Sequence, residues 1–181
     1  MTVDSFTPNG VLSRAAIARL VTGIPPLVEG CRDLDLQLQP NGLDVTVRSA
    51  SAYSADSNCG SIGTRDSDRT LPDSTALSFG ADGWLHLESG PYLLTFNEVV
   101  NLPRNVMALA RPRSSLLRSG VAIHTAVWDA GYSGRSQALM TVHHPQGFWI
   151  QRDARVAQLV FICLDAGDAE GYRGRYQYEN L

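Results

Sequence analysis

The sequence predicts a mainly β fold, a sandwich, jelly roll or barrel, for a single domain formed by residues 1–181. Two observations lead to this fold class. Apolar and polar residues alternate with a period of two in many short runs separated by turn residues, and only one segment has the pattern of a helix. With 181 residues, 44% of them hydrophobic, the chain buries a core without needing a disulfide or a structural metal.

The helix is predicted from Ser13 to about Val21. Serine is a favourable N-cap residue, and the alanine, isoleucine and leucine residues that follow it favour helix. The segment Gly23-Ile24-Pro25-Pro26 then stops the helix, because glycine and proline do not continue it.

The rest of the chain predicts strands, one long excursion and a tail. Strands are expected at Leu43 to Val47, Trp84 to Leu87, Tyr92 to Phe96, Val106 to Ala110, Val121 to Trp128, Gln137 to Val142, Phe148 to Ile150 and Val156 to Leu164. Residues 49–82 are rich in Ser, Asp, Gly and Thr, which indicates a surface excursion. Residues 167–181 lack periodicity and are expected to form a tail that closes over another part of the molecule.

Charge and cysteine content narrow the function classes. The formal net charge of -3 argues against a nucleic-acid-binding protein, which normally carries a basic excess. Residues 101–181 hold more arginines than acids, so a phosphate site is expected in the second half. No targeting signal or membrane span is apparent, and three widely spaced cysteines indicate reduced, mostly buried thiols. We therefore expect a cytoplasmic protein without a membrane partner.

The densest candidate site is the segment Arg111 to Arg118, which follows a predicted strand. It combines three guanidinium groups with the hydroxyls of Ser114 and Ser115, a set that suits a polyphosphate. The alternative is a solvated basic turn, or a short helix capped by Ser114.

A second candidate is Asp129. Alternation would place Ile123, Thr125, Val127 and Asp129 on one face of a strand, so a carboxylate ends an apolar stripe just before a glycine turn. Such an acid is either a turn residue that accepts backbone hydrogen bonds or a base presented at a cleft. His124 and the pair His143 and His144 have no further possible ligand nearby at the spacing of a zinc site, so we expect no metal-histidine site.

Two further polar residues lie within predicted strands. Gln158 is surrounded by apolar residues, and a buried amide needs a hydrogen-bonding partner, which backbone can supply. Asp44 follows a Pro-Asn-Gly turn and, taken alone, is expected to be a strand-end acid near solvent.

Four segments in this order, QPNGLDVTV, PRSSLLRSG, AVWDAGYSG and RVAQLVF, resemble motifs of the dUTPase and dCTP deaminase superfamily. The resemblance covers both ends of the chain and most of residues 84–181, while 49–82 is unmatched, and it is closest to deaminase-like, archaeal-type dUTPases. It implies a jelly-roll-like β-barrel of the dUTPase type with a short N-terminal helix. It also implies a homotrimer whose active sites lie between subunits.

The resemblance also implies roles for individual residues. Asp129 would deprotonate the attacking water, Tyr132 would pack against the deoxyribose, and Arg118 would contact phosphate or a neighbouring subunit. The remaining implied roles are phosphate binding for Arg113, Ser114 and Ser115, recognition of the uracil edge around Thr125 and Ala126, a magnesium shell held through water by Asp44 and Gln158, and covering of the phosphates by Arg175, Tyr176 and Gln177.

The function implied is magnesium-dependent hydrolysis of dUTP to dUMP and pyrophosphate. Deaminases of the superfamily carry a proton-shuttling glutamate five residues after the last glycine of the third motif, and here that position is Leu139. Trp128 is bulkier than the small aliphatic residue expected before Asp129. The alternatives are a dCTP deaminase or bifunctional enzyme, a non-catalytic module that senses dUTP or dTTP, and a β-sandwich binding domain with coincidental motifs.

Overall fold

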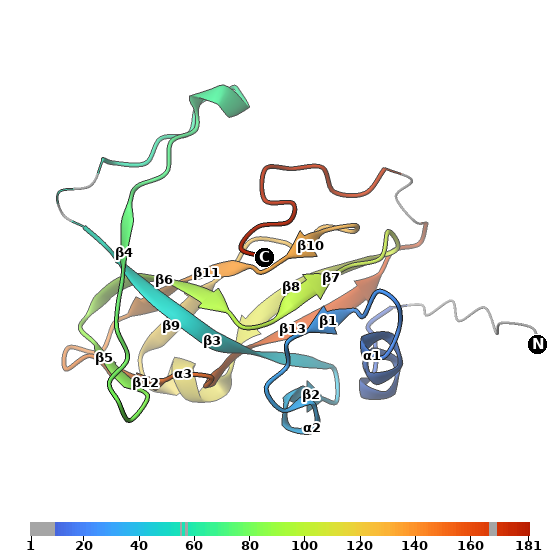
Figure 1. The fold of residues 1–181 in the computed structure, drawn as a ribbon, viewed down its shortest axis with the longest axis horizontal. Helices are drawn as coiled ribbons and strands as arrows, with labels where there is room; N and C mark the ends of the chain where they lie inside the picture. Colours follow the sequence, from blue (N-terminus) through green and yellow to red (C-terminus); the bar gives the residue numbers. More distant parts are fainter. Residues whose placement is uncertain (1–9, 55, 57, 167–169) are drawn as a thin grey trace, which may run out of the picture.

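The computed structural model describes residues 10–54, 56, 58–166 and 170–181. It is mainly β, as predicted (Figure 1). The main sheet is antiparallel and has the order β8-β13-β3-β6-β11-β9. These strands are β8 (Val106–Pro112), β13 (Arg155–Cys163), β3 (Gly42–Tyr53), β6 (Gly90–Phe96), β11 (Gln137–Val142) and β9 (Val121–His124).

A single backbone pair joins the two edges of this sheet into a nearly closed barrel. Ala108 on β8 exchanges two hydrogen bonds, of 2.9 and 3.0 Å, with Trp128, which follows β9 at the opposite edge. Closure pairs backbone groups that an open sheet edge would expose. The interior is filled by large side chains with at most 1% exposure: Leu43, Leu94, Phe96, Met140, Leu159 and Phe161.

Smaller elements surround the barrel. They are β2 (Leu38–Gln39) and β4 (Ser74–Ala76), both on β3; the sheet of β1 (Val28–Glu29), β7 (Val99–Asn101) and β10 (Ser133–Gly134); the pair β5 (Trp84–Leu87) and β12 (Phe148–Gln151); and the helices α1 (Arg14–Val21), α2 (Leu34–Gln37), α3 (Ser114–Arg118) and the 3-10 turn η1 (Asp66–Asp68). The predicted N-terminal helix is confirmed, and Ser13 caps it by accepting a hydrogen bond from the backbone of Ala16. No helix in the described part of the chain has the length and apolarity to cross a membrane.

Among the predicted boundaries, two differ from the structure by four or more residues. The strand expected from Val121 to Trp128 ends at His124, because the chain then leaves β11 in order to reach β8 through Trp128. The surface excursion was expected from residue 49, but β3 continues to Tyr53 and pairs with both β6 and β4. Backbone hydrogen bonds to β6 and β4 extend the strand here, although its small Ser and Ala side chains add little apolar area.

Beyond β3 the excursion projects away from the barrel as a long arm that carries η1 and returns through β4 (Figure 1). Its large apolar residue Ile62 is 83% exposed, so the arm adds little to the core. The three cysteines are unpaired, as expected; Cys59 on the arm is exposed rather than buried.

Candidate active site

Asp44 is the centre of a polar cluster on the barrel strands. It lies on β3 directly opposite Gln158 of β13, whose Nε2 donates to the Asp44 carboxylate at 3.5 Å. The Asp44 carboxylate also pairs with Nε of Arg113 at 3.2 Å and Nη1 of Arg155 at 3.4 Å. Gln158 was expected to need a hydrogen-bonding partner, and that partner is the side chain of Asp44. The expectation that Asp44 lies near solvent was wrong, since its side chain is only 2% exposed.

This cluster carries excess positive charge. Burial raises the pKa of Asp44, while the guanidinium groups of Arg113 and Arg155 and the hydrogen bond from Gln158 oppose that rise. Two guanidinium groups face one carboxylate, and both arginines remain about one-third exposed. The cluster is therefore suited to an anion that reaches the two arginines from solvent.

The segment after β8 forms the short helix α3 rather than an irregular turn. Arg113, not Ser114, occupies the N-cap position, so the helix alternative was correct but its cap was not. Leu116 is buried and anchors the helix. Ser114, Ser115 and Arg118 are exposed, and within the described residues the two serine hydroxyls make no hydrogen bond. They are available to a ligand next to Arg113.

Asp129 lies in the hairpin between the Trp128 closure and β10. It is exposed, and its carboxylate makes no hydrogen bond or ion pair within the described part of the chain. It borders a cavity of about 310 Å³. The other lining residues are Ala126, Val127, Trp128, Tyr132, Ser136, Gln137, Tyr172, Tyr176 and Glu179.

Tyr132 forms a fixed wall of this cavity. It is 5% exposed, and its hydroxyl lies 3.0 Å from Oγ of Ser136 and donates to Oε1 of Glu179 at 2.8 Å. Its ring meets that of Tyr172 edge to face, with 5.8 Å between centroids. Burial is the main reason that the pKa of Tyr132 is raised, so the phenol stays protonated. Trp128 is also buried, and its Nε1 donates to Ser136.

The tail lies on the hairpin of its own chain. Gln177 accepts a hydrogen bond from the backbone N–H of Ser133 and donates one to the carbonyl of Gly131, each at 3.0 Å. Its amide therefore holds the tail in place. Tyr176 lines the cavity and Arg175 is exposed.

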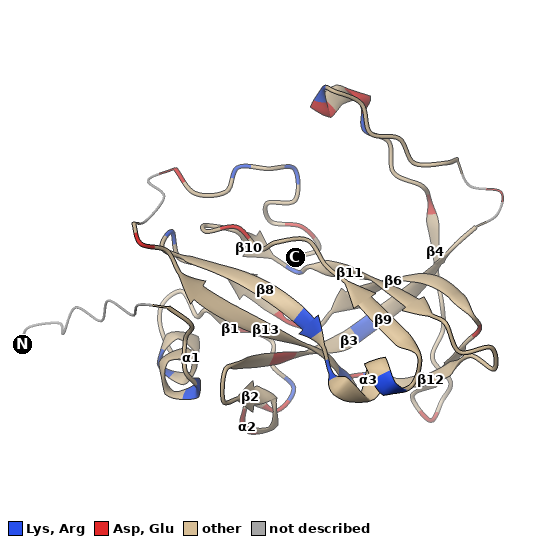
Figure 2. Cartoon of the chain, turned by 180° about the vertical axis from the view of Figure 1, so that it is seen from behind, with Lys and Arg blue, Asp and Glu red and all other residues tan. Residues whose placement is uncertain are grey.

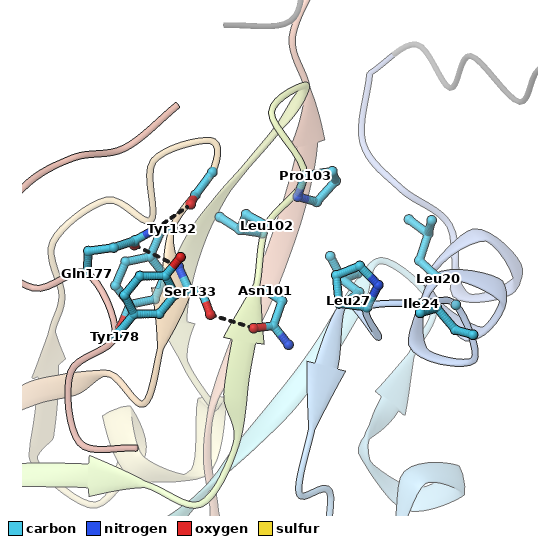
Figure 3. Close-up of a pocket in the computed structure, with 13 residues that line it drawn as sticks. Leu20, Ile24, Leu27, Asn101, Leu102, Pro103, Tyr132, Ser133, Gln177 and Tyr178 are labelled. Atoms are coloured by element: carbon cyan, nitrogen blue, oxygen red, sulfur yellow. Dashed lines mark hydrogen bonds between the residues drawn. The ribbon is translucent and has the colours of Figure 1, made fainter. Parts of the chain in front are cut away.

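Two neighbouring hollows hold other predicted residues. Thr125 lines one together with Arg111 and Ala126, outside the Asp129 cavity. Leu139 lines another, which also contains Glu179. A larger cavity of about 590 Å³ lies on the other side of the hairpin, towards α1 (Figure 3). Its described lining is mostly apolar and holds no acidic or basic side chain, so the candidate base and phosphate ligands lie elsewhere.

The Asp44 cluster and the Asp129 cavity are separate within one chain. The described residues that line the Asp129 cavity include none of Asp44, Arg113, Arg155 or Gln158. In two opposite views, α3 lies below the barrel strands and β10 above them (Figures 1 and 2). Among the described residues there is also no group of three or more metal-ligating His, Cys, Asp or Glu side chains.

Sequence reasoning missed Arg155, Glu98, Gln37 and Glu179. Arg155 is the first residue of the RVAQLVF segment, but an arginine at the start of a strand is not distinguished from an ordinary surface residue. Glu179 is one of three acids in the tail, with Asp168 and Glu170, and the sequence does not single it out. Glu98 and Gln37 are 1% exposed, and nothing in the sequence pattern separates them from surface residues.

Comparison with known proteins identifies relatives over most of the chain. The family described as dCTP deaminase-like matches residues 11–164. A protein of Methanosarcina mazei, named probable deoxyuridine 5'-triphosphate nucleotidohydrolase, is 44% identical over 94% of this chain and 98% of its own length. A protein of the same name from Archaeoglobus fulgidus is 43% identical, also over 94% of this chain and 98% of its own.

Among solved structures, a 2'-deoxycytidine 5'-triphosphate deaminase from Agrobacterium tumefaciens is similar, with a TM-score of 0.62 and 25% identity. The match covers 84% of this chain and 48% of the deaminase, so the chain spans about half of that protein's length.

Proposed function

The chain belongs to the dCTP deaminase-like family, and from this membership we propose that it is a dUTP diphosphatase, which hydrolyses dUTP to dUMP and pyrophosphate. The relatives named probable dUTP nucleotidohydrolases support this choice within the family, because they match nearly the whole chain at 42–44% identity.

The observation that carries the proposal is the carboxylate of Asp129, which has no partner among the described residues and lies at the edge of a cavity walled by Tyr132. A general base must be free to accept a proton from the attacking water. Tyr132 is held rigidly by Ser136 and Glu179, so its ring is placed to pack against a deoxyribose where an added 2'-hydroxyl would clash.

The phosphates are assigned to Arg113 and Arg155, with the hydroxyls of Ser114 and Ser115. Hydrolysis between two phosphates requires neutralisation of the charge that develops on their oxygens, and guanidinium groups supply it. Arg118 is one turn further along α3 and is assigned to phosphate or to a neighbouring subunit.

The residues present fit a magnesium ion bound through water. Asp44 and Gln158 offer one carboxylate and one amide, and Mg²⁺ often takes few protein ligands because substrate phosphates and waters complete its shell. When bound, the ion would neutralise phosphate charge and orient the triphosphate. Asp44 and Gln158 would hold its waters, while the chemistry of the attacking water rests on Asp129.

Deamination is the less favoured activity. The position of the deaminase glutamate is occupied by Leu139, whose side chain has no group that can donate or accept a proton. Among the described residues that line the same hollow, Glu179 has the only carboxylate, and it is engaged with the hydroxyl of Tyr132.

A complete site requires a second copy of the chain. The base cavity and the phosphate cluster are not brought together within one chain, and we propose a homotrimer in which the hairpin of one subunit faces α3 of another. The tail then accompanies the hairpin of its own subunit. This arrangement also explains why Asp129, Ser114 and Ser115 have no partner among the described residues.

The test is pyrophosphate release by purified protein with magnesium, offered dUTP, dCTP, dTTP and UTP separately, with products identified by chromatography. We expect dUTP to give dUMP, with little action on UTP. Conversion of dCTP to a uracil nucleotide would show a deaminase, and binding of dUTP or dTTP without turnover would show a sensing module.

A further inference from the structure

We propose that Gln37 and Glu98 are positioning residues for the phosphate site: their side chains complete a missing rung of the sheet beside Asp44 and thereby fix its carboxylate. The inference rests on the proposed function, which assigns the Asp44 cluster to the triphosphate. Among the described hydrogen bonds and ion pairs, none joins either residue to Arg113 or Arg155, and neither residue is assigned to contact substrate.

Strand β3 has a gap along one edge at residues 44–46. Its other edge pairs with β13 over this stretch. On the edge with the gap, β2 pairs only with Gly42 and Leu43, and β6 begins to pair at Val47. The backbone groups between these two neighbours point into the protein without a strand to meet them. Buried backbone groups need partners, so the gap has to be filled.

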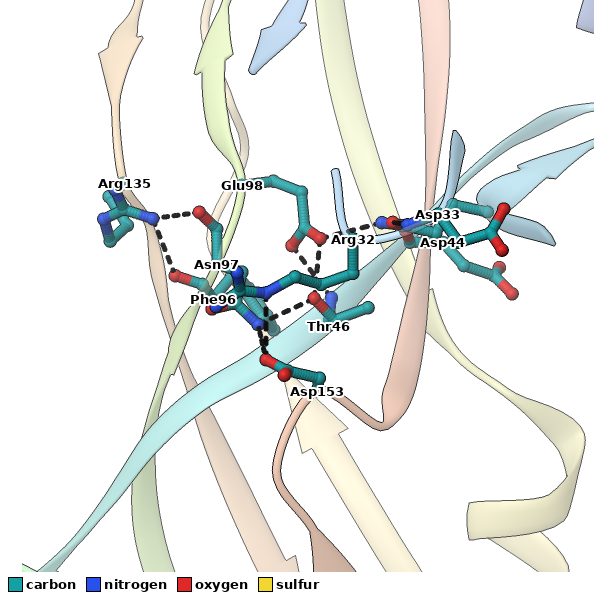
Figure 4. Close-up of polar contacts among 10 residues, drawn as sticks. Arg32, Asp33, Asp44, Thr46, Phe96, Asn97, Glu98, Arg135 and Asp153 are labelled. Atoms are coloured by element: carbon teal, nitrogen blue, oxygen red, sulfur yellow. Dashed lines mark hydrogen bonds and ion pairs between the residues drawn. The ribbon is translucent and has the colours of Figure 1, made fainter. Parts of the chain in front are cut away.

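Two side chains fill it. Gln37 donates one hydrogen bond to the carbonyl oxygen of Asp44 at 2.8 Å and another to Oε1 of Glu98 at 2.7 Å. Oε2 of Glu98 accepts the backbone N–H of Thr46 at 2.8 Å (Figure 4). In an antiparallel ladder the neighbouring strand receives such a carbonyl and N–H pair from residues i and i+2. Gln37 and Glu98 therefore act here as that strand.

A carboxylate is suited to this place despite its burial. Glu98 accepts three hydrogen bonds, the third from Oγ1 of Thr46 at 2.6 Å. An apolar side chain of the same size would leave the Thr46 N–H and the second amide hydrogen of Gln37 without partners, which is costly in the interior.

The rung controls the site because the opposite edge of β3 is irregular there. Pairing with β13 shifts between Arg155 and Ala157, next to the residues that meet Asp44. Without the rung, the edge with the gap would keep only the β2 pairing up to Leu43 and the hydrogen bond from the N–H of Asn97 to the carbonyl of Thr46. The other edge is paired with a bulged strand. The carboxylate of Asp44 would then lose the fixed distances to Arg113 and Arg155 on which charge neutralisation depends.

The experiment compares binding of two ligands by calorimetry in magnesium buffer: dUMP, and the non-hydrolysable analogue α,β-imido-dUTP. For Glu98→Gln we expect affinity for the triphosphate analogue to fall about tenfold while dUMP changes less than about twofold. Leu94→Val is the matched control, equally buried and on neighbouring β6. It should lower the unfolding temperature without changing the ratio of the two affinities.

A double-mutant cycle with Asp44→Asn tests whether Glu98 affects ligand binding through Asp44. If Glu98 acts through Asp44, Glu98→Gln adds no further loss of analogue binding in the Asp44→Asn protein. Equal losses for both ligands, an unchanged analogue affinity or fully additive effects would overturn the inference. Wild-type protein that binds neither nucleotide would instead contradict the proposed function, and the inference with it. Should Glu98→Gln fail to fold, Gln37→Met, which keeps Glu98 bonded to Thr46, gives the same comparison.

Discussion

The hydroxyl of Tyr132 donates a 2.8 Å hydrogen bond to Oε1 of Glu179, which joins the hairpin that carries Asp129 to the C-terminal tail of the same chain. The bond lies at the cavity that Asp129 borders. Removing this hydrogen bond tests whether the tail holds the ring of Tyr132, the proposed contact for the deoxyribose, in place.

For Tyr132→Phe we expect faster amide hydrogen exchange in residues 172–181 and a three- to tenfold rise in KM for dUTP, because a hydrogen bond to a charged group contributes about 1.5–3 kcal/mol, less where it is partly exposed. Hydrogen exchange read by mass spectrometry and steady-state kinetics check both effects. Tyr178→Phe is the control, since Tyr178 is 65% exposed and its hydroxyl makes no described bond. Unchanged exchange in the tail would show that the bond does not hold it.

Asp129→Asn should lower kcat for dUTP by about 10²–10⁴-fold, the usual contribution of a general base, while dUTP still binds. Single-turnover assays and calorimetry separate the two quantities. Asp73→Asn, which changes an exposed acid on the arm, should leave both unchanged. A fully active Asp129→Asn protein would exclude this residue as the base.

Mixed trimers test where the site lies. Asp129→Asn and Arg113→Ala proteins should each be nearly inactive. After unfolding and refolding together in equal amounts, they should recover about one quarter of wild-type activity, because one quarter of randomly assembled interfaces pair an intact hairpin with an intact phosphate motif. No recovery, with both chains found in the same trimers, would place the whole site within one subunit.

Arg155→Met should raise KM for dUTP about tenfold, because one of the two guanidinium groups that face Asp44 is lost. The same change should leave dUMP affinity within about twofold, since dUMP carries a single phosphate and depends less on neutralising charge than the triphosphate does. Arg48→Met removes an exposed arginine elsewhere on β3 and serves as the control. Steady-state kinetics and calorimetry give the comparison, and equal effects of the two variants would count against the assignment.

The pH dependence of stability reports on Glu98. Burial raises the pKa of Glu98 above its ordinary value of 4.5, so the folded protein binds more protons than the unfolded chain in the window above that value. The resulting stabilisation is fully present below pH 4.5 and is lost as the pH rises through the folded pKa. Urea unfolding should therefore show wild type losing stability relative to Glu98→Gln as the pH rises. A difference that does not vary with pH would show that Glu98 does not titrate there.

The sequence was sufficient for elements whose signals are local. Ser13 caps α1 as predicted, and the strands Trp84–Leu87 and Gln137–Val142 have the expected bounds. The strand from Val121 was predicted too long because its end depends on closure with Ala108, a contact between segments that are distant in the sheet order. Local alternation carries no information about such a contact.

The same distinction holds for the site. Asp44 and Gln158 were selected as polar residues in apolar strands, and they are indeed opposite one another. Gln37 and Glu98 could not be selected, because their role depends on a gap between β2 and β6 that exists only once the sheet has formed. Arg155 was missed for another reason: an arginine at a strand end resembles an ordinary surface residue.

The backbone pair between Ala108 and Trp128 has a consequence for how the enzyme matures. Asp129 directly follows the residue that closes the barrel, so the proposed base reaches its place only when the two edge strands have met. The pair joins the first and the last strand of the sheet order, so the barrel is complete only once this contact has formed. Partly folded chains would therefore be inactive even with the phosphate cluster assembled, and recovery of turnover after refolding would report completion of the barrel rather than formation of its strands.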